Sequence, residues 1–212
     1  MPRGRWRAAA QLYAFGFLLM GSACSSGSEP SYGSSSSSIV LLEEQGALWL
    51  ASPDDDELVR IDANTLEVLE RLPAAGGPVA LARSENRLAV ALRRASELVL
   101  IEDLSRPELV RVPIACGGSS SLAFSADGSL FVSCPSDRRW LRIEGQEVTQ
   151  RVELEGKPRA VAVADDTVHV SLSELGRIER YAVADGTSLG ALEIDLESGF
   201  SASQLDALAP VD

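Results

Sequence analysis

From Ile39 onward, the chain alternates short apolar runs rich in Val, Leu and Ile with breaks made of Gly, Pro, Asp and Ser. No stretch keeps its apolar residues at the 3.6-residue period that an amphipathic helix requires. The pattern therefore predicts many short β-strands. Because such chains are often built from repeats, self-similarity at a fixed period is the next signal to examine.

Four segments resemble one another and begin about 40 residues apart, a period typical of propeller blades. They are LWLASPDDDELVRID from Leu48, LAVALRRASELVLIE from Leu88, LFVSCPSDRRWLRIE from Leu130 and VHVSLSELGRIERYA from Val168. The last three are preceded by the glycine-led stretches GGPVALARSENR, GGSSSLAFSADGS and GKPRAVAVADDT. Each repeat holds four strand-sized pieces, as a β-propeller blade requires. A β-sandwich with accidental periodicity is the alternative fold.

The predicted fold is all-β, a propeller of four-stranded blades over residues 39–212. The expected blades are 39–74, 75–114, 115–155 and 156–196, with a partial fifth at 197–212 whose inner strand is residues 205–209. Propellers close into rings, so this count allows two interpretations. The chain is either a four-bladed ring with one extra inner strand or the front part of a longer propeller interrupted inside blade five.

The motif G-x-P-x-x-(Val/Leu)-Ala, followed by FSADGSLFVS, resembles the repeat of YVTN-type propellers, which are related to NHL and lactonase-like propellers. The resemblance covers nearly all of the chain after Ile39 and implies a ring of about seven blades. The tetrapeptide Tyr-Val-Thr-Asn itself is absent, and so is the Trp-Asp signature of the other large propeller class. Because this fold hosts unrelated activities, the resemblance implies architecture more than function.

Residues 1–23 are predicted to be a secretory signal, with Arg3, Arg5 and Arg7 before an apolar stretch that is short for a transmembrane helix. An N-terminal membrane anchor is the alternative. LLMGSAC resembles the bacterial lipoprotein box, which implies lipidation of Cys24; cleavage that leaves an unmodified cysteine is also open. Residues 24–38 form a Ser/Gly-rich tether. We therefore expect an exported lipoprotein of the bacterial cell envelope.

The chain has a net charge of −12, and loss of the three signal arginines leaves −15. Such a surface repels nucleic acid and gains nothing from an anionic bilayer, so neither is an expected partner. Membrane attachment would depend on the lipid at Cys24.

Catalytic motifs are sparse. His169 is the only histidine, so a two-histidine metal site or a haem-attachment motif cannot be built, and we predict no metal and no cofactor. A packed strand histidine is the simpler interpretation of His169. Cys116 and Cys134 flank two strands predicted to form a hairpin through Asp127-Gly128, so they form either a disulfide or two separate thiols.

Loops between the second and third strands of propeller blades share one face with the connections that enter the inner strands, and we expect any ligand on that face. The charged residues that these loops carry are Asp54, Asp55, Asp56, Arg93, Arg94, Asp137, Arg138, Arg139 and Glu174. The arginines could grip an anionic or carboxylate-bearing partner, or all of these residues could be solvated turns. The aligned loops hold arginine, serine or alanine at several of the DDD positions, so the fold does not require carboxylates there and that run is interpreted as one blade's soluble turn.

Three functions fit these observations. The first is a non-enzymatic binding scaffold for a protein, glycan or small molecule. The second is the N-terminal part of a larger propeller enzyme, lactonase-like or fused to a redox domain. The third is a fragment without independent activity.

Overall fold

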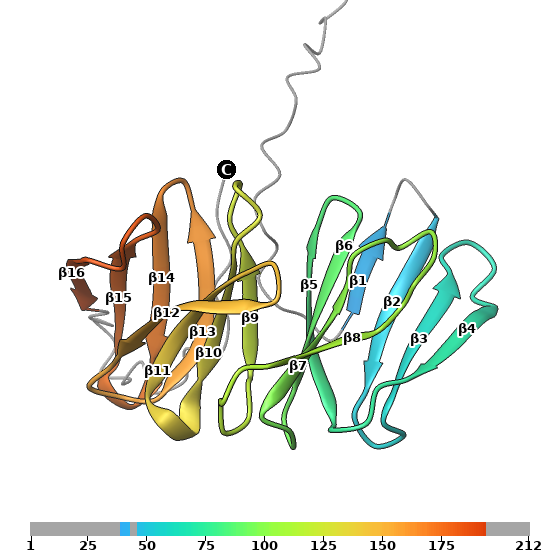
Figure 1. The fold of residues 1–212 in the computed structure, drawn as a ribbon, viewed down its shortest axis with the longest axis horizontal. Helices are drawn as coiled ribbons and strands as arrows, with labels where there is room; N and C mark the ends of the chain where they lie inside the picture. Colours follow the sequence, from blue (N-terminus) through green and yellow to red (C-terminus); the bar gives the residue numbers. More distant parts are fainter. Residues whose placement is uncertain (1–38, 43–45, 194–212) are drawn as a thin grey trace, which may run out of the picture. The chain divides into compact units, whose positions relative to one another are not determined.

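The computed structural model describes residues 39–42 and 46–193, all within the unit Ser31–Asp212. They form four antiparallel four-stranded sheets, each built from strands consecutive in sequence, so the predicted fold of four-stranded propeller blades is confirmed (Figure 1). The signal, the tether with Cys24 and the predicted partial fifth blade lie outside the described residues. Among the described residues, no helix is long and apolar enough to cross a bilayer.

We number the sheets as blades in chain order. Blade 1 contains β1 (Ile39–Leu42), β2 (Ala47–Ser52), β3 (Glu57–Asp62) and β4 (Val68–Pro73). Blade 2 contains β5 (Pro78–Ser84), β6 (Arg87–Leu92), β7 (Glu97–Ile101) and β8 (Val110–Pro113). Blade 3 contains β9 (Ser121–Phe124), β10 (Leu130–Cys134), β11 (Arg139–Glu144) and β12 (Glu147–Glu153). Blade 4 contains β13 (Pro158–Ala164), β14 (Thr167–Leu172), β15 (Arg177–Ala182) and β16 (Ser188–Glu193).

Burial falls from the first to the last strand in blades 2, 3 and 4. Every residue of β9 and β10 is buried, whereas β12 alternates exposed and half-buried residues and β16 is exposed along its whole length. A strand buried on both faces reads as a continuous apolar run, and a strand wetted on one face alternates. This is why the inner strands are rich in Ala, Val and Leu while the outer strands carry Glu, Gln and Arg.

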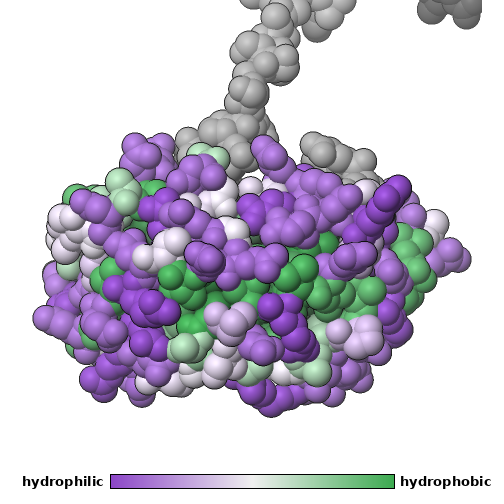
Figure 2. All heavy atoms as spheres, in the orientation of Figure 1, coloured by the Kyte–Doolittle hydropathy of each residue, from purple (hydrophilic) through white to green (hydrophobic). Residues whose placement is uncertain are grey.

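The hydrophobic core lies between neighbouring blades. Trp49 of blade 1 packs with Leu81 and Leu88 of blade 2. Ala82 of blade 2 packs with Leu122 of blade 3, and an equivalent cluster joins blades 3 and 4. Blades 2 and 3 therefore bury both faces against neighbouring blades, as the blades of a propeller do. On the side of the molecule seen in Figure 2, apolar residues run in a band across the middle with hydrophilic residues above and below.

The tight hairpin predicted at Asp127-Gly128 is present. The Asp127 carboxylate accepts hydrogen bonds from the Ser125 hydroxyl (2.5 Å) and the Ser129 amide (3.0 Å), and Gly128 has a φ of 82°. This turn aligns Leu130 with Phe124 and Ser133 with Ser121. The turn chemistry thus fixes the register of the inner pair.

Candidate functional site

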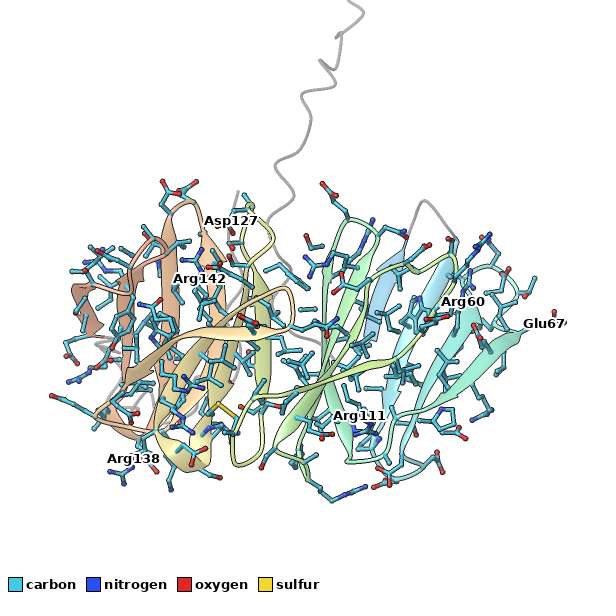
Figure 3. The ribbon with its side chains drawn as sticks, viewed as in Figure 1. Arg60, Glu67, Arg111, Asp127, Arg138 and Arg142 are labelled. Carbon is cyan, nitrogen blue, oxygen red and sulfur yellow. A yellow bond between two sulfur atoms is a disulfide. The ribbon has the colours of Figure 1, made fainter. Side chains whose placement is uncertain are left out.

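The two ends of each blade carry different loops. We call the end with the second-to-third strand loops and the connections entering the inner strands the loop face. The opposite end, with the first-to-second and third-to-fourth turns, is the hairpin face. Figure 3 shows this division in blade 3, where Arg138 lies at one end of the sheet and Asp127 and Arg142 lie at the other.

A backbone hydrogen bond that recurs in three blades holds the loop face together. In each case the first residue after the fourth strand donates its amide to a carbonyl in the loop before the third strand. The bonds run from Ala74 to Asp56 (2.7 Å), from Ile114 to Ser96 (3.0 Å) and from Leu154 to Arg138 (2.8 Å). Because only main-chain atoms take part, the loops can vary in side chain without losing their position.

Asp56 joins blades 1 and 2. Its Oδ1 accepts the amides of Gly76 (3.1 Å) and Gly77 (2.7 Å) and also receives Nη2 of Arg94 at 2.7 Å. These donors, the Gly77 amide first among them, hold the pKa of the Asp56 carboxyl below its ordinary value. The Asp56 carboxylate therefore stabilises the fold at the point where the chain enters blade 2.

The other two aspartates of the DDD run are exposed. Asp55 accepts the Ser52 hydroxyl at 2.7 Å, and the carbonyl of Pro53 receives Arg94 at 3.0 Å. Within the described parts of the chain, no group of three His, Cys, Asp or Glu side chains is arranged to hold a metal ion. Asp54 and Asp55 thus lie on the loop face, where the sequence predicted them.

The blade 3 loop is also tied into the fold. Asp137 accepts the amide of Gly117 at 2.6 Å, and Arg139 donates to the carbonyl of Ala115. The guanidinium of Arg139 lies 3.5 Å from the Asp137 carboxylate, and its side chain is only 20% exposed. Arg139 is therefore occupied by internal partners.

Glu174 in the blade 4 loop forms an ion pair of 3.0 Å with Lys157. The hydrogen bond from Lys157 is the main cause that lowers the pKa of the Glu174 carboxyl, and the charge of Arg138 contributes too. The loops of blades 3 and 4 are thus near enough for Arg138 and Glu174 to interact.

Two exposed arginines remain on the loop face, Arg93 of blade 2 and Arg138 of blade 3. A Cβ placed on Gly118 would come 2.8 Å from the Arg93 carbonyl, so Arg93 lies directly against the entrance of blade 3. Arg138 follows Asp137, which binds the adjacent Gly117. In the described portion, neither guanidinium has a carboxylate within 4.0 Å. The backbone of Arg93 and the loop that carries Arg138 therefore lie beside the Gly117–Gly118 entrance.

The hairpin face contains a groove between blades 2 and 3, with a volume of about 540 Å³. The residues that line it are Arg87, Glu102, Asp127, Gly128, Ser129, Arg142, Glu144 and Gly145. Arg87 pairs with Glu102 (2.7 Å) and donates to the Gly128 carbonyl of the next blade (3.2 Å). Carboxylates from the lining itself thus neutralise the groove's cations.

Arg142 makes the equivalent connection between blades 3 and 4. It donates to the carbonyls of Val183 (2.9 Å) and Ala184 (3.2 Å) and pairs with Asp127 (3.1 Å) and Glu144 (3.0 Å). The sequence analysis missed this residue. An arginine within the apolar alternation of RWLRIE was the available signal, because a buried guanidinium requires several acceptors.

A buried ionic network between blades 3 and 4 was also missed. Glu179 is 8% exposed and accepts Nε of Arg177 (3.1 Å) and the hydroxyl of Tyr181 (2.5 Å). Arg177 also pairs with Glu155 at 2.6 Å. Burial, followed by the bond to Glu179, raises the pKa of the Tyr181 hydroxyl. The residues that align with Glu179 in blades 1 to 3 are Val59, Val99 and Leu141. Blade 4 therefore has a charged residue where the other blades have an apolar one.

His169 is half-buried on β14, between Ala162 and Arg180 of the adjacent strands. Burial is the main cause that lowers the pKa of its imidazole, and the positive charge of Arg180 adds to it. The histidine is thus placed as a packed strand residue.

Cys116 and Cys134 form a disulfide with a Cα–Cα distance of 5.5 Å. Both residues are fully buried beside the Gly117–Gly118 entrance. The bond fixes this entrance to the end of β10, under the loop that carries Arg138.

No family model and no curated protein matches the chain. Among solved structures, it is similar to a streptogramin B lyase (TM-score 0.63, 12% identity), covering 81% of this chain and 57% of that one. It is also similar to virginiamycin B lyase from Staphylococcus aureus (TM-score 0.63, 12% identity; 81% and 58% covered). A third is the dihydro-heme d1 dehydrogenase NirN (TM-score 0.59, 17% identity; 76% and 38% covered). The chain thus spans less than two thirds of each of these proteins, and at these identities the likeness shows one property alone: the fold is that of a β-propeller.

Proposed function

We propose that the protein is a bacterial envelope lipoprotein whose YVTN/NHL-like propeller acts as a non-enzymatic binding scaffold. The ligand site is the loop face at the entrance of blade 3, and the ligand carries carboxylate or other anionic groups. One observation supports this most. Among the described residues, Arg93 and Arg138 beside the entrance have no carboxylate within 4.0 Å, although the charge of Arg138 acts on Glu174, whereas Arg94, Arg139 and Lys157 form ion pairs within the fold.

The physical argument concerns cost and geometry. A guanidinium has a planar arrangement of donors that matches a carboxylate. An exposed arginine outside an ion pair has only water to lose when it binds a carboxylate ligand. The disulfide and the bond from Gly117 to Asp137 hold the backbone between them. Because this backbone is already held, binding a ligand has to order only the two arginine side chains.

Citrate, a tricarboxylate, is a suitable probe for this site. Its affinity is measured by calorimetry at low salt for the wild type, for Arg93→Glu/Arg138→Glu and for the control Arg106→Glu. Arg106 is exposed in the turn between β7 and β8 on the hairpin face, so the control makes the same kind of charge change at the opposite end. We expect the double variant to lose affinity by about tenfold or more, as expected when charge-assisted bonds become repulsive.

The control variant distinguishes the loss of a specific binding site from a general effect of the protein's net charge. Because the chain is acidic, any added glutamate weakens anion binding somewhat. The matched double control is Arg106→Glu/Arg151→Glu, because Arg151 is exposed on the outer strand β12. Equal losses of affinity in the two double variants would show that no site exists at the blade 3 entrance.

The lipoprotein assignment rests on LLMGSAC and on the tether that follows it. Metabolic labelling with an alkyne fatty acid in a bacterial host should label the wild type and leave Cys24→Ala unlabelled. Cys24→Ala should also leave the membrane fraction. Membrane retention of an unlabelled Cys24→Ala would instead favour residues 1–23 as a transmembrane anchor.

A second candidate is the N-terminal part of a larger propeller enzyme. It is favoured by the chain's coverage of only 57–58% of the streptogramin-type lyases. Sequencing the gene beyond Asp212 tests it directly. Two or three further blades, or a haem-binding motif, would support this candidate over a small complete scaffold.

A further inference from the structure

The outer strands of the four blades differ at their central position. In blades 1 to 3 this position holds an exposed arginine: Arg71, Arg111 or Arg151. The strand registers pair these arginines with the third-strand residues Val59, Val99 and Leu141. The corresponding pair in blade 4 is Ala191 with Glu179. Blade 4 therefore has an exposed alanine at the position where the other three blades have a positive charge.

β16 also lacks the other residues that protect a free sheet edge. Charged residues and proline on an edge strand hinder the addition of a further strand. Besides their arginines, the other three outer strands carry Glu70, Pro73, Pro113, Glu147 and Glu153. The first five residues of β16, SLGAL, contain neither a charge nor a proline, and Leu189 and Leu192 are 46% and 47% exposed. Of the four outer strands, β16 is therefore the one most open to pairing with a strand of another chain.

The outer edge of β16 has no neighbouring strand among the described residues. The strand order of blade 4 is β13-β14-β15-β16, so β16 pairs with β15 on one side and ends the sheet on the other (Figure 1). All six residues of β16 are exposed. Such an edge presents a row of backbone donors and acceptors, which is a template for pairing with a further strand.

We propose that β16 pairs antiparallel with β16 of a second copy of this chain, so that the two copies of blade 4 form one continuous sheet. The two-fold axis passes beside Ala191, which lies opposite its counterpart. Residues directly opposite each other in an antiparallel pair have Cβ atoms about 4.5–5.5 Å apart, and like charges there are destabilising. The arginine that blades 1 to 3 carry at this position would therefore oppose the pairing, whereas alanine permits it.

The sequence of β16 suits pairing with itself. With Ala191 at the axis, Leu192 lies opposite Gly190 of the other copy, where the glycine leaves room for the leucine side chain. The one charged residue of the strand is Glu193. Antiparallel pairing separates the two Glu193 residues by four strand positions, about 14 Å, whereas in-register parallel pairing would place them side by side. The strand thus supplies both the fit and the charge separation, which favours a second copy over a strand from a different protein.

The proposed interface is small, because each copy contributes one six-residue strand. Interfaces of this size form weak dimers, so we expect a Kd on the order of 10–100 µM. The interface contains no residue of the proposed ligand site, so each proposal can fail without the other.

Analytical ultracentrifugation of the full chain tests the pairing. Every variant carries Cys24→Ser, so that residue 24 can bear neither a lipid nor an intermolecular disulfide. Ala191→Arg introduces the residue type of blades 1 to 3, and Glu179 opposite it on β15 accommodates the positive charge. We expect the Cys24→Ser chain to form a concentration-dependent dimer and Ala191→Arg to raise the Kd by at least about tenfold. A Cys24→Ser chain that stays monomeric at about ten times the expected Kd overturns the proposal.

Ala184→Arg is the matched control. Ala184 is exposed in the turn before β16 and lies outside the proposed pairing. The control adds the same charge to the same blade, so it should leave the Kd unchanged. Equal increases of the Kd in Ala191→Arg and Ala184→Arg would overturn the assignment of the interface to β16.

Disulfide cross-linking tests the register without an added charge. Ala191→Cys and Glu193→Cys, each with Cys24→Ser, are compared at equal concentration under mild oxidation. A disulfide requires Cβ atoms about 3.5–4.5 Å apart, a spacing that the proposed register approaches at residue 191 and not at residue 193. We expect at least about tenfold more cross-linked dimer with Ala191→Cys. Equal cross-linking of the two variants, or a dimer in the centrifuge that Ala191→Cys does not cross-link, would show that the copies associate through another surface.

Discussion

The carboxylate of Asp56 in blade 1 lies 2.7 Å from the guanidinium of Arg94 in blade 2, and the same oxygen accepts the amides of Gly76 and Gly77. One oxygen atom thus receives three donors at the point where the chain crosses between blades. The backbone of Asp56 has a φ of 57°, a left-handed conformation that Asp adopts more readily than most residues. Asp56 therefore connects blades 1 and 2, whereas its two neighbours in the DDD run do not.

Asp56→Asn should lower the melting temperature by a few degrees at pH 7, whereas Asp54→Asn should leave it unchanged. Because folding lowers the pKa of Asp56, its contribution is present above the ordinary carboxyl value of about 3.9 and is lost as the pH falls through the lowered value. The difference between the variant and the wild type should therefore shrink below about pH 4. A difference that stays constant from pH 7 to pH 3 would show that the charge of Asp56 is not responsible. Thermal unfolding followed by circular dichroism gives the measurement.

The Cys116–Cys134 disulfide should stabilise the entrance of blade 3. A cross-link over a loop of this size contributes about 2–4 kcal/mol, mainly by constraining the unfolded chain. Cys116→Ala/Cys134→Ala should lower the free energy of unfolding by that amount in urea, and a reducing agent should have the same effect on the wild type. A reducing agent should not change the double variant. Should it do so, the effect lies elsewhere in the chain.

The fold could be predicted because its signals are local and repeated. The strand LWLAS and its three counterparts are short apolar runs that recur about 40 residues apart, and Asp127-Gly128 marks a hairpin by turn chemistry alone. The loop-face positions of Asp56, Arg94 and Glu174 followed from the order of strands.

The pairing among those side chains could not be predicted. Which oxygen Arg94 reaches depends on how blade 2 is placed against blade 1, a relation between segments about 40 residues apart. Arg142 was missed for the same reason, because its carbonyl acceptors at Val183 and Ala184 lie on blade 4. Glu179 was missed although its partners Arg177 and Tyr181 lie two residues away on the same strand. A polar residue in an apolar position was the only sequence signal, and it does not reveal the partner.

Gly118 should be intolerant of any side chain. A Cβ there would meet the Arg93 carbonyl at 2.8 Å, and the residue has a φ of 85°. Gly118→Ala should cost about 2–3 kcal/mol from the clash and the strained backbone together. Gly145→Ala is the matched control, since Gly145 has a φ of 59° and nothing within 4 Å of its Cβ. It should cost only about 1 kcal/mol, the price of the left-handed backbone alone. Urea unfolding of both variants gives the comparison, and equal losses would mean that the loop moves away from Gly118 freely.

Breaking the buried network of Arg177, Glu179 and Tyr181 should lower the free energy of unfolding strongly. Replacing its charges with apolar residues should lower it much less. Glu179→Val leaves the Tyr181 hydroxyl and one side of Arg177 without their acceptor, so we expect a loss of about 3 kcal/mol. Glu179→Val/Arg177→Met removes both charges and introduces the valine that blades 1 and 2 carry at this position. This double variant should lose less than Glu179→Val alone, because replacing a buried ion pair by apolar residues is often nearly neutral. Urea unfolding of the wild type, both single variants and the double variant forms a double-mutant cycle. Additive losses would show that the two charges do not stabilise each other, and that the interface of blades 3 and 4 depends on its aromatic packing, Trp140 against Tyr181 at 5.5 Å.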